Sequence, residues 1–192
     1  MSEATLSEST LTESTFIPSI DDAALRSARL SEAGAAWAQR IGANPDSAKL
    51  TYKVDGVGVG SVATRISSGK HQFIVDEPAA LAGDDVAASP VEYALGAIIS
   101  CQVVVYRLYA EQLGIQVDDI TINAEGDLDV RGLFGLDDTV RPGFSDIRLA
   151  VNISGPETQE RYDELARTVE ARCPVQDLFS NPTPFRTAIT KV

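Results

Sequence analysis

Two cysteines, Cys101 and Cys173, are the residues of this chain best suited to covalent chemistry. Cys101 lies inside a long apolar run, and Cys173 closes a second segment of helical pattern just before Pro174. Thiols on apolar faces are usually inert core side chains, because cysteine is among the most buried residue types. If folding brings their Cα atoms within about 7 Å, the two can instead form a redox pair. Sequence spacing alone leaves both interpretations open.

A reactive Cys101 would need help from another part of the fold. Its helix is expected to begin at Pro90, which at the helical rise leaves Cys101 about 18 Å from the N-terminus. The helix dipole fades within the first turn, and burial raises the pKa of a thiol. A thiolate at Cys101 therefore requires a cation or a hydrogen-bond donor from a different segment.

Glu92 is the nearest acidic residue on the same predicted helix. Nine residues at 100° each place Glu92 and Cys101 on opposite faces, with about 13 Å of rise between them. Ser89 is a suitable N-cap, Pro90 suits the first helical position, and Glu92 occupies the capping-box position. We therefore interpret Glu92 as part of a cap, with a supporting role at Cys101 as the weaker alternative.

His71 and Arg65 are the other candidates for a supporting role at the thiol. His71 is the only histidine and lies on a predicted strand after a turn. Arg65 lies on the same hairpin, and an inward-facing arginine there could stabilise a thiolate. Most strand arginines and lone histidines face water, which is the simpler interpretation of both.

The composition limits the possible partners and cofactors. Acidic residues outnumber basic ones by 28 to 16, giving a net charge of −12, which argues against nucleic acid and anionic membrane surfaces. No run approaches 18 consecutive apolar residues, so no membrane span is expected. One histidine and two cysteines cannot complete a zinc site alone, and no nucleotide-binding motif occurs. We therefore expect neither a metal nor a cofactor.

The local patterns predict an ordered series of elements. An Ala-rich helix is expected over 21–41, with Trp37 docking it on the body, and strands are expected over 49–77, with a turn at 67–70. A loop over 78–89 precedes a long helix, 90–113, that is apolar nearly all round and so expected to be deeply buried. Strands near 117–128 and 144–154 follow, joined by the loop 131–143, then a helix over 156–172 and a last strand over 184–192. This order predicts an α+β fold with antiparallel sheets.

Several motifs together resemble the OsmC/Ohr family, the osmotically induced and organic hydroperoxide resistance proteins. They are Asp76-Glu77-Pro78, Gly83-Asp84-Asp85, the run from Ser89 to Leu95, Ser100-Cys101, the run from Gly126 to Gly132, Arg172-Cys173-Pro174-Val175 and Asn181-Pro182. The match covers residues 48–192 approximately and keeps the motifs in order. It leaves residues 1–20 as an expected disordered tail and 21–47 as a helical extension.

The resemblance implies an intertwined homodimer, in the OsmC-like branch, with cysteine-bearing helices in its core. It implies a thiol peroxidase in which Cys101 attacks an organic hydroperoxide, becomes a sulfenic acid and is resolved by Cys173 as a disulfide. A lipoyl-type dithiol would reduce the disulfide, and no cofactor would be needed. With two cysteines and no signal peptide in the sequence, a cytoplasmic location in an oxidative stress response is expected.

One motif departs from the family pattern. Ohr-type members carry Asn-Pro-Glu, whereas this chain has Val91 after Pro90 and the carboxylate one place later, at Glu92. One residue turns a side chain by about 100° around a helix, so Glu92 does not replace the family's acid. The alternative is a catalytically weak protein of the same fold that binds a small apolar ligand or senses redox state.

Overall fold

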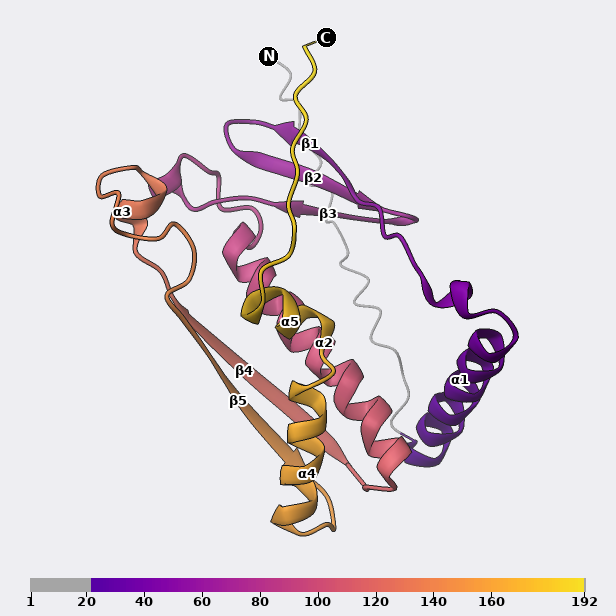
Figure 1. Cartoon of the computed structure of the whole chain (residues 1–192). Coiled ribbons are helices and arrows are strands. Elements are labelled where there is room, and N and C mark those ends of the chain that lie inside the picture. The colour runs from indigo at the N-terminus through magenta and orange to yellow at the C-terminus, as the bar shows by residue number, and fades with distance from the viewer. Residues whose placement is uncertain (1–21, 192) are drawn as a thin grey trace, which may run out of the picture.

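The computed structural model describes residues 22–191 and has an α+β architecture with antiparallel sheets (Figure 1). The helices are α1 (Ala23–Ala43), α2 (Pro90–Leu113), α3 (Val130–Leu133), α4 (Gln159–Glu170) and α5 (Pro174–Ser180), with short 3-10 turns at Pro45–Ala48 and Ala79–Leu81. The strands are β1 (Asp55–Val59), β2 (Ala63–Ser68), β3 (His71–Val75), β4 (Asp119–Asp127) and β5 (Asp146–Ser154). The predicted tail, residues 1–20, lies outside the described residues.

Two separate antiparallel sheets flank the long helix α2. Strands β1, β2 and β3 form one sheet, with Asp55 opposite Ser67 and Ser68 opposite His71. The predicted turn at residues 67–70 is confirmed, and Gly69 supplies the positive φ of 57° that such turns need. The sheet lies near the beginning of α2 in Figure 1, where Tyr93 donates its hydroxyl to the Ile74 carbonyl at 2.9 Å.

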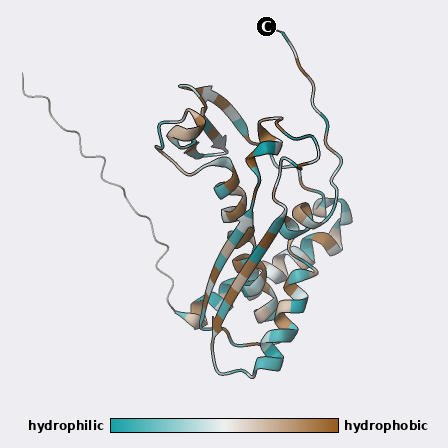
Figure 2. Cartoon of the chain, turned by 90° about the vertical axis from the view of Figure 1, so that its left-hand side faces the viewer, coloured by the Kyte–Doolittle hydropathy of each residue, from teal (hydrophilic) through white to brown (hydrophobic). Residues whose placement is uncertain are grey.

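The second sheet is a long two-stranded ribbon beside α2. Strands β4 and β5 pair from Asp119 opposite Ser154 to Asp127 opposite Asp146. Half-buried and exposed side chains alternate strictly along both strands, and the hydropathy colours alternate in the same way in Figure 2. The ribbon thus turns its apolar face toward the helices and its exposed face toward water, as period-two alternation predicts.

The core lies where the second half of α2 meets α4 and the start of β4. Eight buried residues form it: Val105, Tyr106, Ala110, Ile115, Val117, Leu165, Val169 and Cys173. Leu165, Val169 and Cys173 recur at helical spacing and are all buried, while Tyr162, one turn before Leu165, is half-buried.

Helix α2 is less covered than its apolar sequence predicts. Only 22 % of its most apolar 18-residue window is buried, and Val104 in its middle is 56 % exposed. By length and composition alone α2 could cross a membrane, a criterion that the core helix of a soluble protein also meets. The expected deep burial is therefore wrong for the single chain, because α4, α5 and the ribbon cover only part of the helix circumference.

Three further details differ from the sequence-based expectations. Residues 50–54 alternate like a strand but precede β1 without pairing, and residues 184–191 are not the predicted last strand. Phe185 and Ile189 in that segment are 91 % and 95 % exposed, and an extended segment without a partner strand has no ladder to join. The predicted helix over 156–172 ends earlier, at Glu170, and Pro174 begins α5 rather than only stopping a helix.

Helix α1 occurs close to the predicted range but docks through residues other than Trp37. Ser27 and Ser31 donate to the Glu111 carboxylate, and Arg26 donates to the Val117 carbonyl at 3.1 Å. Trp37 is 40 % exposed and stacks with Arg40 of its own helix, 4.8 Å from the ring centroid. Polar contacts near the start of α1 thus attach it to the C-terminal end of α2.

Candidate functional site

The start of α2 is fixed by the capping box that the sequence predicts. The Ser89 backbone N–H and hydroxyl both donate to Glu92 Oε2, at 2.8 and 2.6 Å, and the Glu92 N–H donates back to Ser89 Oγ. Hydrogen bonds from the Ser89 side chain and backbone lower the pKa of Glu92. The Glu92 carboxylate is therefore hydrogen-bonded to Ser89 at the N-terminus of α2, whereas Cys101 lies in the middle of that helix.

A buried carboxylate, that of Asp76, holds the loop that leads to Ser89. Asp76 is 2 % exposed, and its Oδ2 accepts from the backbone N–H groups of Asp84 and Val86 at 3.1 and 3.2 Å. Backbone hydrogen bonds, first among them that of Glu77, lower the pKa of Asp76. The other oxygen, Oδ1, is buried, has no hydrogen-bond partner among residues 22–191 and lies against Gly83, so the loop closes tightly before Ser89.

Cys173 is held at the junction of α4 and α5. Its N–H donates to the Val169 carbonyl at 2.9 Å, and its carbonyl accepts from the Asp177 N–H at 3.0 Å. It serves as the N-cap residue of α5, with Pro174 at the first helical position. Proline favours the first position of a helix, so Pro174 was a sequence signal for α5, a helix that was not predicted.

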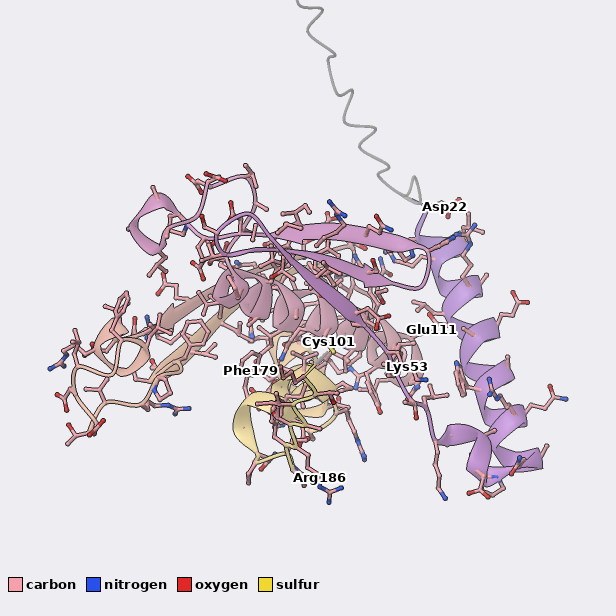
Figure 3. All side chains as sticks on the ribbon, turned by 90° about the horizontal axis from the view of Figure 1, so that it is seen from above. Asp22, Lys53, Cys101, Glu111, Phe179 and Arg186 are labelled. Carbon is pink, nitrogen blue, oxygen red and sulfur yellow. The ribbon has the colours of Figure 1, made fainter. Side chains whose placement is uncertain are left out.

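The fold brings Cys101 and Cys173 together, although 71 residues separate them in sequence. Both are free thiols, Cys101 half-buried and Cys173 buried, and Cys173 lies near enough to raise the pKa of Cys101. Seen from above, Cys101 lies between the ribbons of α2 and α5 (Figure 3). The fold thus places two thiols near one another where the junction of α4 and α5 packs on α2.

The surroundings of Cys101 favour the neutral thiol. Burial is the largest cause that raises its pKa, and the neighbouring Cys173 raises it further. The backbone N–H of Val175, in the first turn of α5, acts in the opposite direction and lowers the pKa of Cys101. No lysine, arginine or histidine of the described residues is among the groups that shift this pKa.

Arg65 and His71 lie on the three-stranded sheet, away from this junction. Arg65 is exposed on β2 and His71 is exposed at the start of β3. Neither is among the groups that act on the Cys101 thiol. The residues that sequence analysis missed are Val175, which supplies a donor, and Gln102 and Gln176, whose side chains are hydrogen-bonded at 2.6 Å.

A hollow of about 320 Å³ opens beside the glutamine pair, between α2, α5 and β5. Its apolar walls come from Ile98 of α2, from Ile147, Leu149 and Val151 of β5, and from Phe179 of α5. Cys173 lines a different hollow, at the start of α5. Among the described residues, no group of three or more histidine, cysteine or acidic side chains could hold a metal ion.

Comparisons with known proteins agree with this architecture. A family model described as OsmC-like protein matches residues 83–188, a range that includes both cysteines. No curated protein sequence matches the chain.

Solved structures match the fold at low sequence identity. An OsmC like protein from Mycoplasma pneumoniae superposes with a TM-score of 0.59 and 20 % identity, over 68 % of this chain and 88 % of that one. An organic hydroperoxide resistance protein OsmC from Legionella pneumophila gives 0.54 and 19 %, over 68 % and 90 %. The organic hydroperoxide resistance protein OhrB of Bacillus subtilis gives 0.51 and 22 %, over 68 % and 91 %.

Proposed function

Because the chain belongs to the OsmC-like protein family, we propose that it is a cysteine-based peroxidase that reduces organic hydroperoxides. The observation that carries the proposal is that Cys173, at the α4–α5 junction, lies near enough to Cys101 of α2 to raise the pKa of the Cys101 thiol. A peroxidatic and a resolving cysteine must approach one another before a disulfide can form, whereas inert core thiols need not. Organic hydroperoxide resistance proteins among the similar structures support this substrate class.

The reaction would consume both thiols and one hydroperoxide. The Cys101 thiolate attacks the outer oxygen, so that an S–O bond forms, the O–O bond breaks and the alkoxide leaves as an alcohol after protonation. The Cys173 thiolate then attacks the sulfenic sulfur of Cys101, forming the S–S bond and releasing water. Two electrons pass from the thiol pair to the peroxide, and a lipoyl-type dithiol returns them by exchange with the disulfide.

The raised pKa of Cys101 indicates what the single chain lacks. We propose an intertwined homodimer in which a second copy covers α2 and supplies a cation to the thiol. An exposed stripe on one face of α2 supports this assembly; its residues are Tyr93, Gly96, Ala97, Ser100 and Val104. The location proposed for the dimer is the cytoplasm, with neither nucleic acid nor a membrane as a partner.

The hollow between α2 and β5 suits the apolar part of an alkyl hydroperoxide. Four aliphatic side chains and Phe179 form its apolar part, and Gln102, the residue after Cys101, lines it together with Gln176 and Glu170. An apolar wall binds a hydrocarbon chain through area removed from water, which hydrogen peroxide lacks. We therefore propose that alkyl hydroperoxides are preferred over hydrogen peroxide.

Peptide mapping under non-reducing conditions tests the proposal. Full-length protein treated with a slight excess of cumene hydroperoxide should yield linked peptides containing Cys101 and Cys173. The Cys173→Ser variant should accumulate a sulfenic acid at Cys101 that dimedone traps, whereas Cys101→Ser should yield neither product. Wild-type protein that shows no link and no sulfenic acid would contradict the proposal.

The second candidate function is a catalytically weak protein that binds a small apolar ligand or senses redox state. The raised pKa of Cys101 favours it, because a protonated thiol attacks peroxides slowly. Steady-state turnover with a lipoyl reductant separates the two functions. A sensor forms the disulfide once without sustained turnover, and a peroxidase turns over at a rate that Cys101→Ser abolishes.

A further inference from the structure

A pair of glutamines joins α2 to α5 beside the two cysteines. Gln102 directly follows Cys101, is 3 % exposed, and donates from Nε2 to Oε1 of Gln176 at 2.6 Å. In the part of the chain that the structure describes, this is the only hydrogen bond that joins a side chain of α5 to a side chain of another element. Glutamine is mostly a surface residue, so a buried one on a core helix needs a reason to be there.

The position of α5 depends on few contacts. None of its residues is buried, and it is only seven residues long. Gln176 follows Val175, whose backbone N–H belongs to the first helical turn and so lacks an intrahelical acceptor. That N–H is the group that lowers the pKa of Cys101. A bond at Gln176 therefore fixes the part of α5 that touches the thiol.

We propose that Gln102 and Gln176 are positioning residues that hold the start of α5 against α2, so that the Val175 N–H and the Cys173 thiol stay at Cys101. The proposal rests on the proposed function, in which Cys101 reacts and Cys173 resolves it. Neither glutamine is among the groups that act directly on the Cys101 thiol. Both therefore work through Val175, which stabilises the thiolate, and through Cys173, which must reach the sulfenic sulfur.

A pair of amide side chains is suited to holding α5 against α2, because their hydrogen bond forms in only one relative position of the two helices. An apolar contact tolerates small sliding, but a buried amide that loses its partner pays the desolvation cost of an unmade hydrogen bond. The pair thus sets one register between α5 and α2, at the height of Cys101 along the helix. A single substitution at either glutamine should loosen that register.

The test compares Gln176→Leu, Gln102→Leu and the double variant with wild type in the full-length protein. In a Cys173→Ala background, iodoacetamide alkylation against pH reports Cys101 alone. The midpoint should move to higher pH in each single variant, while the limiting rate at high pH stays the same. With both cysteines present, disulfide formation after one equivalent of cumene hydroperoxide should slow about tenfold in each single variant and less in the double variant.

Gln112→Leu is the matched control, because Gln112 is an exposed glutamine on the same helix and lies outside the site. Gln176→Glu keeps an acceptor for Gln102 Nε2 and should restore most of the rate of disulfide formation. Folded Gln176→Leu protein with a wild-type alkylation midpoint and a wild-type rate would overturn the proposal.

Two arms keep this test separate from that of the proposed function. If Gln102→Leu does not fold, the Gln176→Leu variant alone tests the positioning role, because Gln176 is half-buried and its substitution removes less buried contact. If wild type forms no disulfide with the hydroperoxide, the peroxidase proposal fails. A shifted alkylation midpoint would still support the positioning role, and an unshifted one would overturn that role as well.

Discussion

At the scale of single residues, the chemistry of this chain depends on what surrounds one sulfur atom. Burial and the neighbouring thiol hold the pKa of Cys101 above its ordinary value of 9.0, and one backbone N–H opposes them. The raised pKa means that folding favours the neutral thiol. Its contribution to stability is present below the ordinary value and is lost as the pH rises through the folded value.

The first prediction concerns the contribution of Cys173 to that pKa. Cys173→Ala removes both effects of the neighbouring thiol, so the alkylation midpoint of Cys101 in the reduced protein should fall relative to wild type. The midpoint is measured from the rate of iodoacetamide modification at a series of pH values, with mass spectrometry of the Cys101 peptide. A midpoint that stays unchanged or rises would show that the two thiols do not interact in solution.

The second prediction concerns Gly83 beside the buried Asp76. A Cβ at Gly83 would lie 1.7 Å from the Glu77 carbonyl oxygen, so Gly83→Ala must displace backbone. We expect it to destabilise the fold by more than about 2 kcal/mol, measured by urea unfolding. Gly58→Ala is the control, because its Cβ would meet nothing within 4 Å, and its effect should stay within about 1 kcal/mol. Equal effects of the two substitutions would refute the close approach.

At the scale of elements, the ends of helices bring the site together. Ser89 and Glu92 set where α2 begins, and Pro174 sets where α5 begins. The two ends decide which residues of α2 and α5 face one another. Glu92 was a candidate for a supporting role at Cys101 from sequence, and its place in the cap accounts for its carboxylate without that role.

The third prediction tests the cap. Ser89→Ala removes a side chain that is both donor and acceptor at the start of α2, and should cost about 1 kcal/mol of stability. Gln112→Ala, at an exposed position of the same helix, should change the unfolding free energy by less than about 0.5 kcal/mol.

Glu92→Gln gives the matching test of function. Glutamine also serves at this capping-box position, so hydroperoxide consumption should remain near that of wild type. A large loss of peroxidase rate without a loss of stability would instead give Glu92 a role at the thiol.

At the scale of the whole molecule, the single chain leaves apolar surface uncovered. The stripe along α2 from Tyr93 to Val104, and the extended segment with Phe185 and Ile189, all face away from the chain's own core. Exposed apolar surface of this extent marks an interaction site, and the proposed second copy would cover it.

The fourth prediction follows from this surface. Val104→Glu places a charge in the middle of the exposed face of α2 without disturbing the core of the single chain. Sedimentation equilibrium should show a dimer for wild type and a monomer for the variant, since an unpaired charge in an interface is costly. A dimer retained in Val104→Glu would place the interface elsewhere. Val104→Ala, which adds no charge, should remain dimeric.

The sequence by itself determined the elements, because their signals are local. The cap at Ser89, the turn at Gly69 and the alternation along β4 and β5 each depend on neighbours within a few residues, and the structure has all three. Pairing partners are not local, so strands were wrongly expected at 50–54 and 184–191, which pair with no strand among the described residues.

Only the tertiary structure decided what surrounds Cys101. Sequence spacing left open whether Cys173 would meet it, because 71 intervening residues carry no distance information. Packing of α4 and α5 on α2 brings the two thiols together and adds the Val175 N–H and the bond between Gln102 and Gln176. These are contacts across elements, and no pattern along one segment encodes them.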